Sequence, residues 1–392
     1  MAWFAVGAAA AMLAVIMGML VNGLTAFFVP MEHSEGWARA DVASINSFGL
    51  IGLAFGSVVM GYVADRLSIR AVCLLAASTM GVCLIVASQA GSPWMLCALF
   101  FLAGALGGGT LFAPIFAYVG NWFPKSAGVA IGVAAAGQAV GQGGVPFLAA
   151  NLIESFGWRN AMLALGCGTL AILLPLACGM RQASTAAGAS FREPQLEPAL
   201  AVPMLAAAVF FCCTCMAVPL MHLMPLIQSL CISSTDAGGV MFAMLLAAIA
   251  GRVAYGKLCD KIGATRSWFV ASALQTVGVL AFTQFGNLRE FLVFAVVYGF
   301  AYAGVMTSLL VAIRALTPAR NKATWMGIVL SFAWLGHAFG GFQGAFAYDL
   351  TAGYGAGFAA GALAGASNLI LVGMLIWLTR PKARSPRFAV SP

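Results

Sequence analysis

The sequence predicts an all-helical membrane protein with twelve transmembrane helices, arranged as two six-helix bundles related by pseudo-symmetry. Three observations support this fold class. The chain of 392 residues is 62% hydrophobic and only 8% charged, whereas soluble domains carry about 25% charged residues. The charges also cluster, which leaves uncharged stretches long enough for a helix to cross a bilayer. Finally, sequence motifs recur at one fixed spacing, which indicates two related halves.

Twelve apolar windows follow one another along the chain, separated by short polar or charged segments. The first, at 5–29, is not preceded by basic residues and is closely followed by a second apolar window. We therefore interpret it as a span rather than as a cleavable signal peptide. The other windows lie at 41–64, 71–90, 95–122, 127–152, 160–180, 201–229, 236–258, 266–285, 290–315, 323–348 and 355–379.

An internal repeat connects the two halves. The stretch GYVADRLSIR at 61–70 has a counterpart, GKLCDKIGATR, at 256–266, and the aspartates Asp65 and Asp260 lie 195 residues apart. The same spacing aligns Gly132 with Gly327, Gly141 with Gly336, Lys125 with Arg320 and Gln142 with His337. We expect an N-terminal bundle at 1–180, a cytoplasmic linker at 181–200, a C-terminal bundle at 201–380 and a cytoplasmic tail at 381–392.

The basic residues predict the orientation of the chain in the membrane. Of the 19 lysines and arginines, fifteen lie in alternate loops or at the C-terminus, three lie on the opposite side and one lies within a span. By the positive-inside rule, both termini are cytoplasmic. The net charge of +8 then reflects topology and not a nucleic-acid partner. The ten cysteines lack metal-ligand spacing, so we expect no metal and no cofactor.

Two parallel repeats of six spans are the plan of one large class of secondary transporters, in which the substrate binds between the halves near the bilayer midplane. The doubled pattern G-x-x-x-D-R/K resembles the signature loop of the major facilitator superfamily. That resemblance implies a conformational switch for alternating access at both loops. Its candidate residues are Gly61, Asp65, Arg66 and Arg70, and Gly256, Asp260, Lys261 and Arg266. The aspartates can pair with a basic residue or cap a neighbouring helix; the alternative is a simple basic anchor at the membrane edge.

Four further stretches resemble the monocarboxylate transporter and oxalate–formate antiporter group of that superfamily. They are EGWARADVAS at 35–44, YVGNWFPKSAGVAIG at 118–132, GWRNAM at 157–162 and GRVAYGKLCDKIG at 251–263. Two signals of other branches are absent. The segment at 101–110 lacks the arginine that many proton-coupled members carry, and Gln142 replaces the proline typical of drug–proton antiporters. The resemblance therefore implies a small carboxylate substrate rather than a drug.

Arg252 is the strongest candidate for a substrate-binding residue. All eleven acidic residues lie in loops or at helix ends, but Arg252 lies within a span, sixteen residues after Asp236 and eight before Asp260. Those separations correspond to about 24 Å and 12 Å of helix. A guanidinium in a cavity without an acid can bind a carboxylate through two hydrogen bonds. The related transporters place a substrate-binding arginine at this position; the alternative is an arginine that reaches the membrane interface.

Other polar residues within spans are weaker candidates for the same site. His337 is predicted near the midplane, where it can exchange a proton, bind a carboxylate or donate to a backbone carbonyl. Tyr118 is similar to a tyrosine that lines the site in related transporters. His222, Gln142, Gln138, Asn22, Tyr298 and Tyr302 complete the set of candidates. Such residues also form hydrogen bonds between membrane helices without any further role.

Two departures from the animal monocarboxylate–proton symporters leave the coupling open. Asn22 replaces a lysine of the first span, and Ala248 replaces an aspartate one turn before Arg252. Anion exchange and a histidine-based proton route are both compatible with these replacements. We expect a monomeric, multi-pass transporter of the plasma (inner) membrane that has no enzymatic activity. It would move a small carboxylate by symport or exchange, with protons or a counter-anion; efflux of hydrophobic drugs is the alternative.

Overall fold

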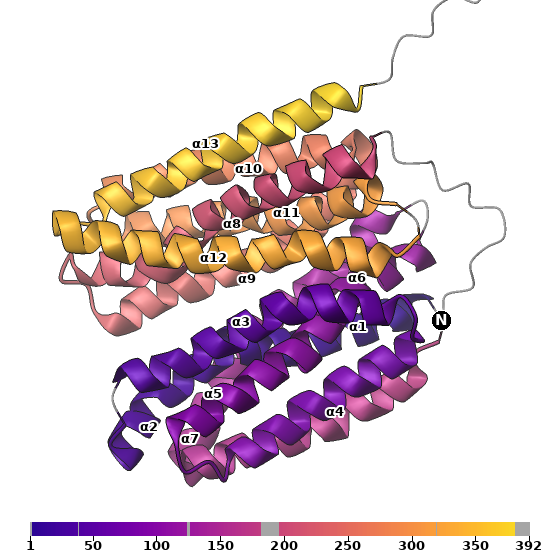
Figure 1. The fold of residues 1–392 in the computed structure, drawn as a ribbon. Coiled ribbons are helices and arrows are strands. Elements are labelled where there is room, and N and C mark those ends of the chain that lie inside the picture. The colour runs from indigo at the N-terminus through magenta and orange to yellow at the C-terminus, as the bar shows by residue number, and fades with distance from the viewer. Residues whose placement is uncertain (1, 38, 124–125, 182–195, 319, 381–392) are drawn as a thin grey trace, which may run out of the picture.

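The computed structural model describes residues 2–37, 39–123, 126–181, 196–318 and 320–380, in two bundles of helices (Figure 1). Part of the expected linker, the C-terminal tail and Lys125 lie outside the described residues. The N-terminal half contains α1 (Ala2–Met17), η1 (Gly18–Asn22), η2 (Gly23–Phe27), α2 (Phe28–Glu35), α3 (Arg39–Ala64), α4 (Ile69–Ala87), α5 (Pro93–Leu102), η3 (Ala103–Gly108), α6 (Gly109–Trp122) and α7 (Ala127–Gly179). The C-terminal half contains α8 (Pro198–Gln228), α9 (Ser234–Ile262), α10 (Ala264–Ala281), η4 (Phe282–Gln284), α11 (Leu288–Leu316), α12 (Lys322–Thr351) and α13 (Gly355–Leu378).

The predicted fold class is confirmed. Within the described residues, ten helical stretches are long and apolar enough to cross a membrane. One of them, α7, contains the fifth and sixth predicted windows, which meet at a kink where Gly157 has a φ of 76°. The ninth window corresponds to α10, a helix of 18 residues that is not among the ten. Together these elements account for the twelve predicted spans.

Local sequence signals explain where several helices begin. Ser68 precedes α4, and its hydroxyl accepts a hydrogen bond from Ala71 N at 3.2 Å. Ser92 caps α5 in the same way, and the proline that follows it occupies the first turn. Asn287 caps α11 through Glu290 N at 3.0 Å. These side chains satisfy backbone N–H groups that have no partner inside the helix.

The first and fourth spans are not continuous α-helices. The first changes from α to π geometry at Gly18–Asn22 and then to a 3₁₀ turn, and the fourth contains a π-helical segment at Ala103–Gly108. Small residues allow close helix contacts at both places. A Cβ on Gly18 would lie 2.6 Å from the carbonyl oxygen of Gly141 in α7. Irregular turns within a membrane helix are tolerated where neighbouring helices cover the backbone.

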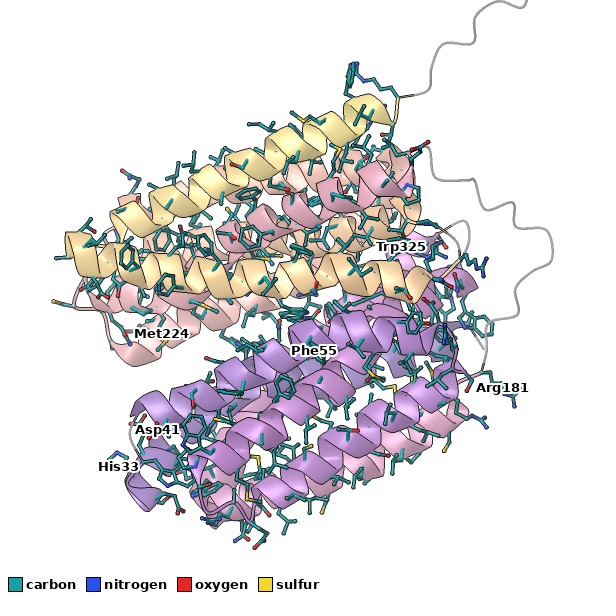
Figure 2. All side chains as sticks on the ribbon, in the orientation of Figure 1. His33, Asp41, Phe55, Arg181, Met224 and Trp325 are labelled. Carbon is teal, nitrogen blue, oxygen red and sulfur yellow. The ribbon has the colours of Figure 1, made fainter. Side chains whose placement is uncertain are left out.

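We call the end of the molecule that carries Arg181, the loop at 65–68 and Gly263 the linker end, and the opposite end the far end. Figure 2 shows Arg181 and Trp325 toward the linker end, whereas His33, Asp41 and Met224 lie at the far end. Between the two halves, α3 packs along α12 and α7 packs along α9. In Figure 1 the two halves lie together at the linker end, and their ribbons diverge toward the far end.

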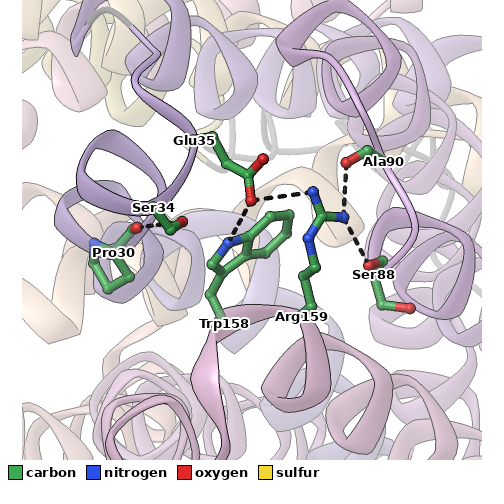
Figure 3. Close-up of polar contacts among 7 residues, drawn as sticks. All are labelled: Pro30, Ser34, Glu35, Ser88, Ala90, Trp158 and Arg159. Carbon is green, nitrogen blue, oxygen red and sulfur yellow. Dashed lines mark hydrogen bonds and ion pairs between the residues drawn. The ribbon is translucent and has the colours of Figure 1, made fainter.

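A polar cluster at the far end joins three segments of the N-terminal half (Figure 3). Arg159 forms an ion pair of 3.1 Å with Glu35, at the end of α2. It also donates to the carbonyl oxygens of Ser88 at 3.1 Å and Ala90 at 2.8 Å, just beyond the end of α4. The indole N–H of Trp158 donates to Glu35 at 3.3 Å. The cluster therefore holds the irregular first span against α7 and α4.

Candidate functional site

Two aspartates hold the halves together at the linker end. Asp65 of the N-terminal half accepts hydrogen bonds from the backbone N–H groups of Ala323 at 3.0 Å and Thr324 at 2.8 Å. The hydroxyl of Thr324 donates to the same carboxylate at 2.5 Å. Ala323 and Thr324 lie in the first turn of α12. Asp65 thus caps a helix of the other half, where a negative charge also interacts favourably with the helix dipole.

The second aspartate makes the reciprocal contact. Asp260 accepts from Gly128 N at 2.9 Å and Val129 N at 3.0 Å, in the first turn of α7. Positions 128 and 323 differ by the same 195 residues that separate the two aspartates. The repeat in the sequence therefore appears in space as two related caps, one in each direction across the interface.

The glycines of the repeated motif make these caps possible. A Cβ on Gly61 would lie 2.7 Å from the carbonyl oxygen of Ala323, and a Cβ on Gly256 would clash with the backbone of Gly128. Each aspartate can reach the neighbouring helix only because the two backbones approach this closely.

The basic residues of the motif lie differently. The guanidinium of Arg66 donates to the hydroxyl of Tyr62 and lies 4.1 Å from the centroid of its ring. Arg70, Lys261 and Arg266 are exposed. Of the two sequence-based possibilities for the aspartates, the structure shows helix capping.

The side chain of Arg252, in α9, contacts α7 of the N-terminal half. It is only 3% exposed, so it does not extend to the membrane interface. Its Nη1 atom donates to the carbonyl oxygen of Ala135 at 2.9 Å and to Oε1 of Gln138 at 3.1 Å, both in α7. Its Nε atom is buried and has no hydrogen-bond partner. In the part of the chain that the structure describes, no carboxylate pairs with this guanidinium.

Two tyrosines of α11 extend this polar region into the C-terminal half. The side chain of Tyr302 interacts with that of Arg252. Its ring stacks on the ring of Tyr298 with centroids 5.7 Å apart and planes inclined by 15°. Tyr298 is 2% exposed, and its hydroxyl has no hydrogen-bond partner. Arg252, Gln138 and Tyr302 thus form one cluster, with Tyr298 stacked behind it.

Aromatic residues form a second contact between the halves. The indole ring of Trp334 in α12 packs against Phe112 of α6 at a centroid distance of 5.4 Å. His337 follows one turn later on α12, and its ring lies 6.1 Å from that of Trp334. The indole N–H of Trp334 is buried and has no partner. The sequence reasoning missed Trp334, because a tryptophan in an apolar helix carries no signal of its position.

Two further candidates lie on the N-terminal half. Gln142 follows Gln138 by four residues on α7 and is half-buried, so it lies on the same helix face one turn closer to the far end. Asn22 ends the π-helical turn of the first span, and its carbonyl oxygen accepts from Thr25 at 2.6 Å.

Tyr118 and His222 bond to backbone groups away from the Arg252 cluster. The Tyr118 hydroxyl donates to the carbonyl oxygen of Arg181 at 2.7 Å, at the linker end. The Nε2 atom of His222 lies 2.9 Å from the carbonyl oxygen of Gly341, which connects α8 to α12 within the C-terminal half. The side chains of both residues therefore have local structural partners.

One contact between the halves was not anticipated. Arg314, near the end of α11, donates to Oδ1 of Asn121 in α6 at 2.9 Å. A Cβ on Gly120 would overlap the Arg314 side chain. From the sequence, Arg314 was only one of the fifteen basic residues assigned to the cytoplasmic side, and nothing in the sequence identified Asn121 as its partner.

Comparisons with known proteins agree with this architecture. The family model of the Major Facilitator Superfamily matches residues 10–203 and 203–391. Monocarboxylate transporter 13 of Rattus norvegicus is 24% identical over 96% of this chain and 88% of its own length. The Fujikurins efflux protein of Gibberella fujikuroi is 25% identical over 79% of this chain and 68% of its own length.

A solved structure shows the same fold. The proton:xylose symporter XylE superposes with a TM-score of 0.77 at 13% sequence identity and covers 96% of both chains. The family model accounts for nearly the whole chain in two consecutive matches, which correspond to the two halves of the repeat. The chain belongs to the Major Facilitator Superfamily and is a multi-pass membrane transporter.

Proposed function

We propose that this transporter moves a small organic carboxylate across the membrane by alternating access. The main support is Arg252. A buried charge without a counter-charge is costly in a membrane protein and generally marks a functional site. Its Nη1 atom is already bonded to α7, whereas its buried Nε atom has no partner. A carboxylate can bind at the Nε side of the guanidinium and neutralise it.

The proposed site couples binding to the contact between the halves. Arg252 belongs to the C-terminal half, and its present partners, Ala135 and Gln138, belong to the N-terminal half. A carboxylate bound at the Nε side attracts the guanidinium more strongly than these neutral acceptors do. The substrate therefore weakens one connection between the halves when it binds, and a ligand can shift a conformational equilibrium only through such differential contacts.

The two aspartate caps are the proposed conformational switch. In this structure Asp65 and Asp260 connect the halves at the linker end. To open that end, both carboxylates have to leave the N-termini of α12 and α7. Because an N-cap contributes about 0.5–2 kcal/mol, two caps can be broken and re-formed during each cycle. Gly61 and Gly256 permit these contacts, and the basic residues of the two motifs, Arg66, Arg70, Lys261 and Arg266, belong to the same proposed switch.

Both modes of coupling remain part of the proposal. His337 lies on α12 beside Trp334 and provides a titratable group for proton-linked transport. If transport is not linked to protons, the transporter exchanges one anion for another. The name of the rat relative favours a monocarboxylate. The fungal relative is named as an efflux protein, which favours the direction of transport in the second candidate, efflux of drugs or other uncharged hydrophobic solutes. We further propose a monomer in the plasma (inner) membrane with both termini in the cytoplasm.

Reconstitution in liposomes tests the carboxylate function. Uptake of labelled mono- and dicarboxylates is measured with and without a proton gradient, for the wild type and for Arg252→Ala and Arg252→Lys. We expect no uptake by the alanine variant and little by the lysine variant, because lysine lacks the planar fork. Arg289→Ala is the matched control, since Arg289 is exposed. Normal uptake by Arg252→Ala would contradict the proposed site.

A further inference from the structure

An apolar groove lies between α7 and α9, at the boundary of the two halves. Its volume is about 370 Å³, within the range of small-molecule sites. Every residue that lines it is apolar. The residues important here are Ala139, Gly143, Gly144 and Phe147 of α7, and Phe242 and Ile249 of α9.

The groove begins about one helical turn from Arg252, which is not itself among the residues that line it. Ile249 precedes Arg252 by three residues on α9, and Ala139 directly follows Gln138 on α7, whose side chain accepts from the guanidinium at 3.1 Å. From Ala139 the groove extends eight residue steps along α7 to Phe147, which corresponds to about 12 Å. A buried cation about one turn beyond the inner end of the groove, and hydrocarbon along the groove itself, complement an anion with a carboxylate head and an apolar tail.

Two glycines leave the groove open. A Cβ on Gly143 or on Gly144 would meet no atom within 4 Å. Gly132 of the same helix differs, since a Cβ there would lie 2.5 Å from the carbonyl oxygen of Arg252. Gly132 brings α7 and α9 together, whereas Gly143 and Gly144 leave space between them. At the outer edge of the groove, Phe147 and Phe242 are 73% and 61% exposed, so the groove also opens sideways toward the bilayer.

We propose that this groove binds the apolar tail of the substrate while Arg252 binds its carboxylate. The preferred substrates are then carboxylates with an alkyl or aryl tail, and not the smallest members of the class. This inference rests on the carboxylate function proposed above and adds the feature that sets its specificity.

A chain-length series tests the inference by equilibrium binding. Acetate, butyrate, hexanoate and octanoate are titrated calorimetrically into the protein in lipid nanodiscs. Binding is preferred to uptake because protonated alkyl carboxylates cross bilayers unaided. We expect the Kd to fall by up to about fourfold for each added methylene that the groove buries. Octanol, which has the tail but no charge, should not displace octanoate.

Filling the groove should remove the dependence on chain length. In Gly143→Leu and Gly144→Leu we expect the Kd for octanoate to rise to that for butyrate, with the Kd for acetate unchanged. Gly168→Leu is the matched control. Gly168 also lies in α7 with open space at its Cβ position, but it does not line the groove, so all four affinities should stay at wild-type values.

The outcomes separate this inference from the function on which it rests. If binding requires Arg252 but is equally strong for all four acids, or if the leucine variants weaken acetate and octanoate equally, the tail site is wrong and the carboxylate function stands. Displacement of octanoate by octanol would mean that the groove holds any hydrocarbon, including lipid, and would also overturn the inference. If no acid binds, or if Arg252→Ala binds all four normally, the carboxylate function itself fails.

Discussion

Gln138 and Arg252 are joined by a hydrogen bond of 3.1 Å that crosses from the N-terminal to the C-terminal half. Both side chains are almost completely buried, at 2% and 3% exposed. The amide oxygen is thus a neutral acceptor on the same guanidinium that we propose to bind the carboxylate of the substrate. This relationship makes the affinity for substrate depend on a residue that need not contact the substrate at all.

Replacement of Gln138 by leucine should therefore tighten substrate binding. A hydrogen bond to a charged group contributes about 1.5–3 kcal/mol. In Gln138→Leu the transporter without substrate loses this contribution. The substrate-bound state loses less, because the carboxylate at the Nε side gives the guanidinium a stronger, charged acceptor. We expect the Kd for the transported carboxylate to fall about tenfold, measured by calorimetry in nanodiscs.

The control for this experiment is Gln142→Leu, one turn along the same helix, for which we expect a change of less than about threefold. A higher Kd in Gln138→Leu would show that Gln138 is itself a ligand for the substrate rather than a competitor.

Removal of either aspartate cap should open the linker end. Asp65→Ala leaves the N–H groups of Ala323 and Thr324 without their partner, at a cost of about 1–2 kcal/mol to the closed state. The closed-to-open ratio should then fall about 5- to 30-fold. Spin labels are attached at Arg70→Cys and Arg320→Cys in a background without reactive cysteines. Pulsed electron paramagnetic resonance then reports the distance between the two halves at this end.

The second cap provides an internal comparison. Asp260→Ala should shift the same distance distribution by a similar amount, and the double variant should shift it by nearly the sum of the two free energies. Asp236→Ala is the control, because Asp236 bonds to Ser233 within its own half. An unchanged distribution in Asp65→Ala would reduce the motif to a basic anchor at the membrane edge.

The sequence was informative about the spans and about Arg252. Apolar windows predicted the helices because lipid requires long uncharged segments with internally satisfied backbones. The absence of acids from the interior of these windows predicted a cation without an ion pair. The breaks at Gly18–Asn22 and Ala103–Gly108 could not be predicted, because they depend on how closely a particular neighbour approaches.

The partners of the candidate residues were harder to predict. Ala135 and Gln138 meet Arg252 only through the packing of α7 on α9, which no pattern within one helix encodes. The partners of the two aspartates can be related from the sequence, because positions 128 and 323 are separated by the same 195 residues as Asp65 and Asp260. Once one aspartate is known to cap a helix across the interface, the repeat identifies the other pair.

The far-end cluster should contribute to stability mainly through Arg159 and backbone carbonyls. Arg159 and Glu35 are 38% and 23% exposed, so their ion pair is screened and contributes less than about 1 kcal/mol. The carbonyl oxygens of Ser88 and Ala90 lose a charged donor in Arg159→Ala, at a further cost of about 1–3 kcal/mol. We expect the Tm of Arg159→Ala in detergent to fall by several degrees, and that of Glu35→Gln by about a third as much. Equal losses would assign the stabilisation to the ion pair instead.

The two histidines of the C-terminal half should differ in their effect on pH dependence. A histidine that gains a proton attracts an anion more strongly. If His337 provides the proton-linked route, uptake by the wild type increases when the external pH falls from 7.5 to 5.5. His337→Gln, which introduces the residue found at the matching position 142, should then give uptake that is independent of pH.

His222→Gln should retain the pH dependence with a lower Tm, because His222 connects α8 to Gly341. Liposome uptake over this pH range decides between the two modes of coupling: an unchanged pH profile in His337→Gln would exclude the histidine route and leave anion exchange.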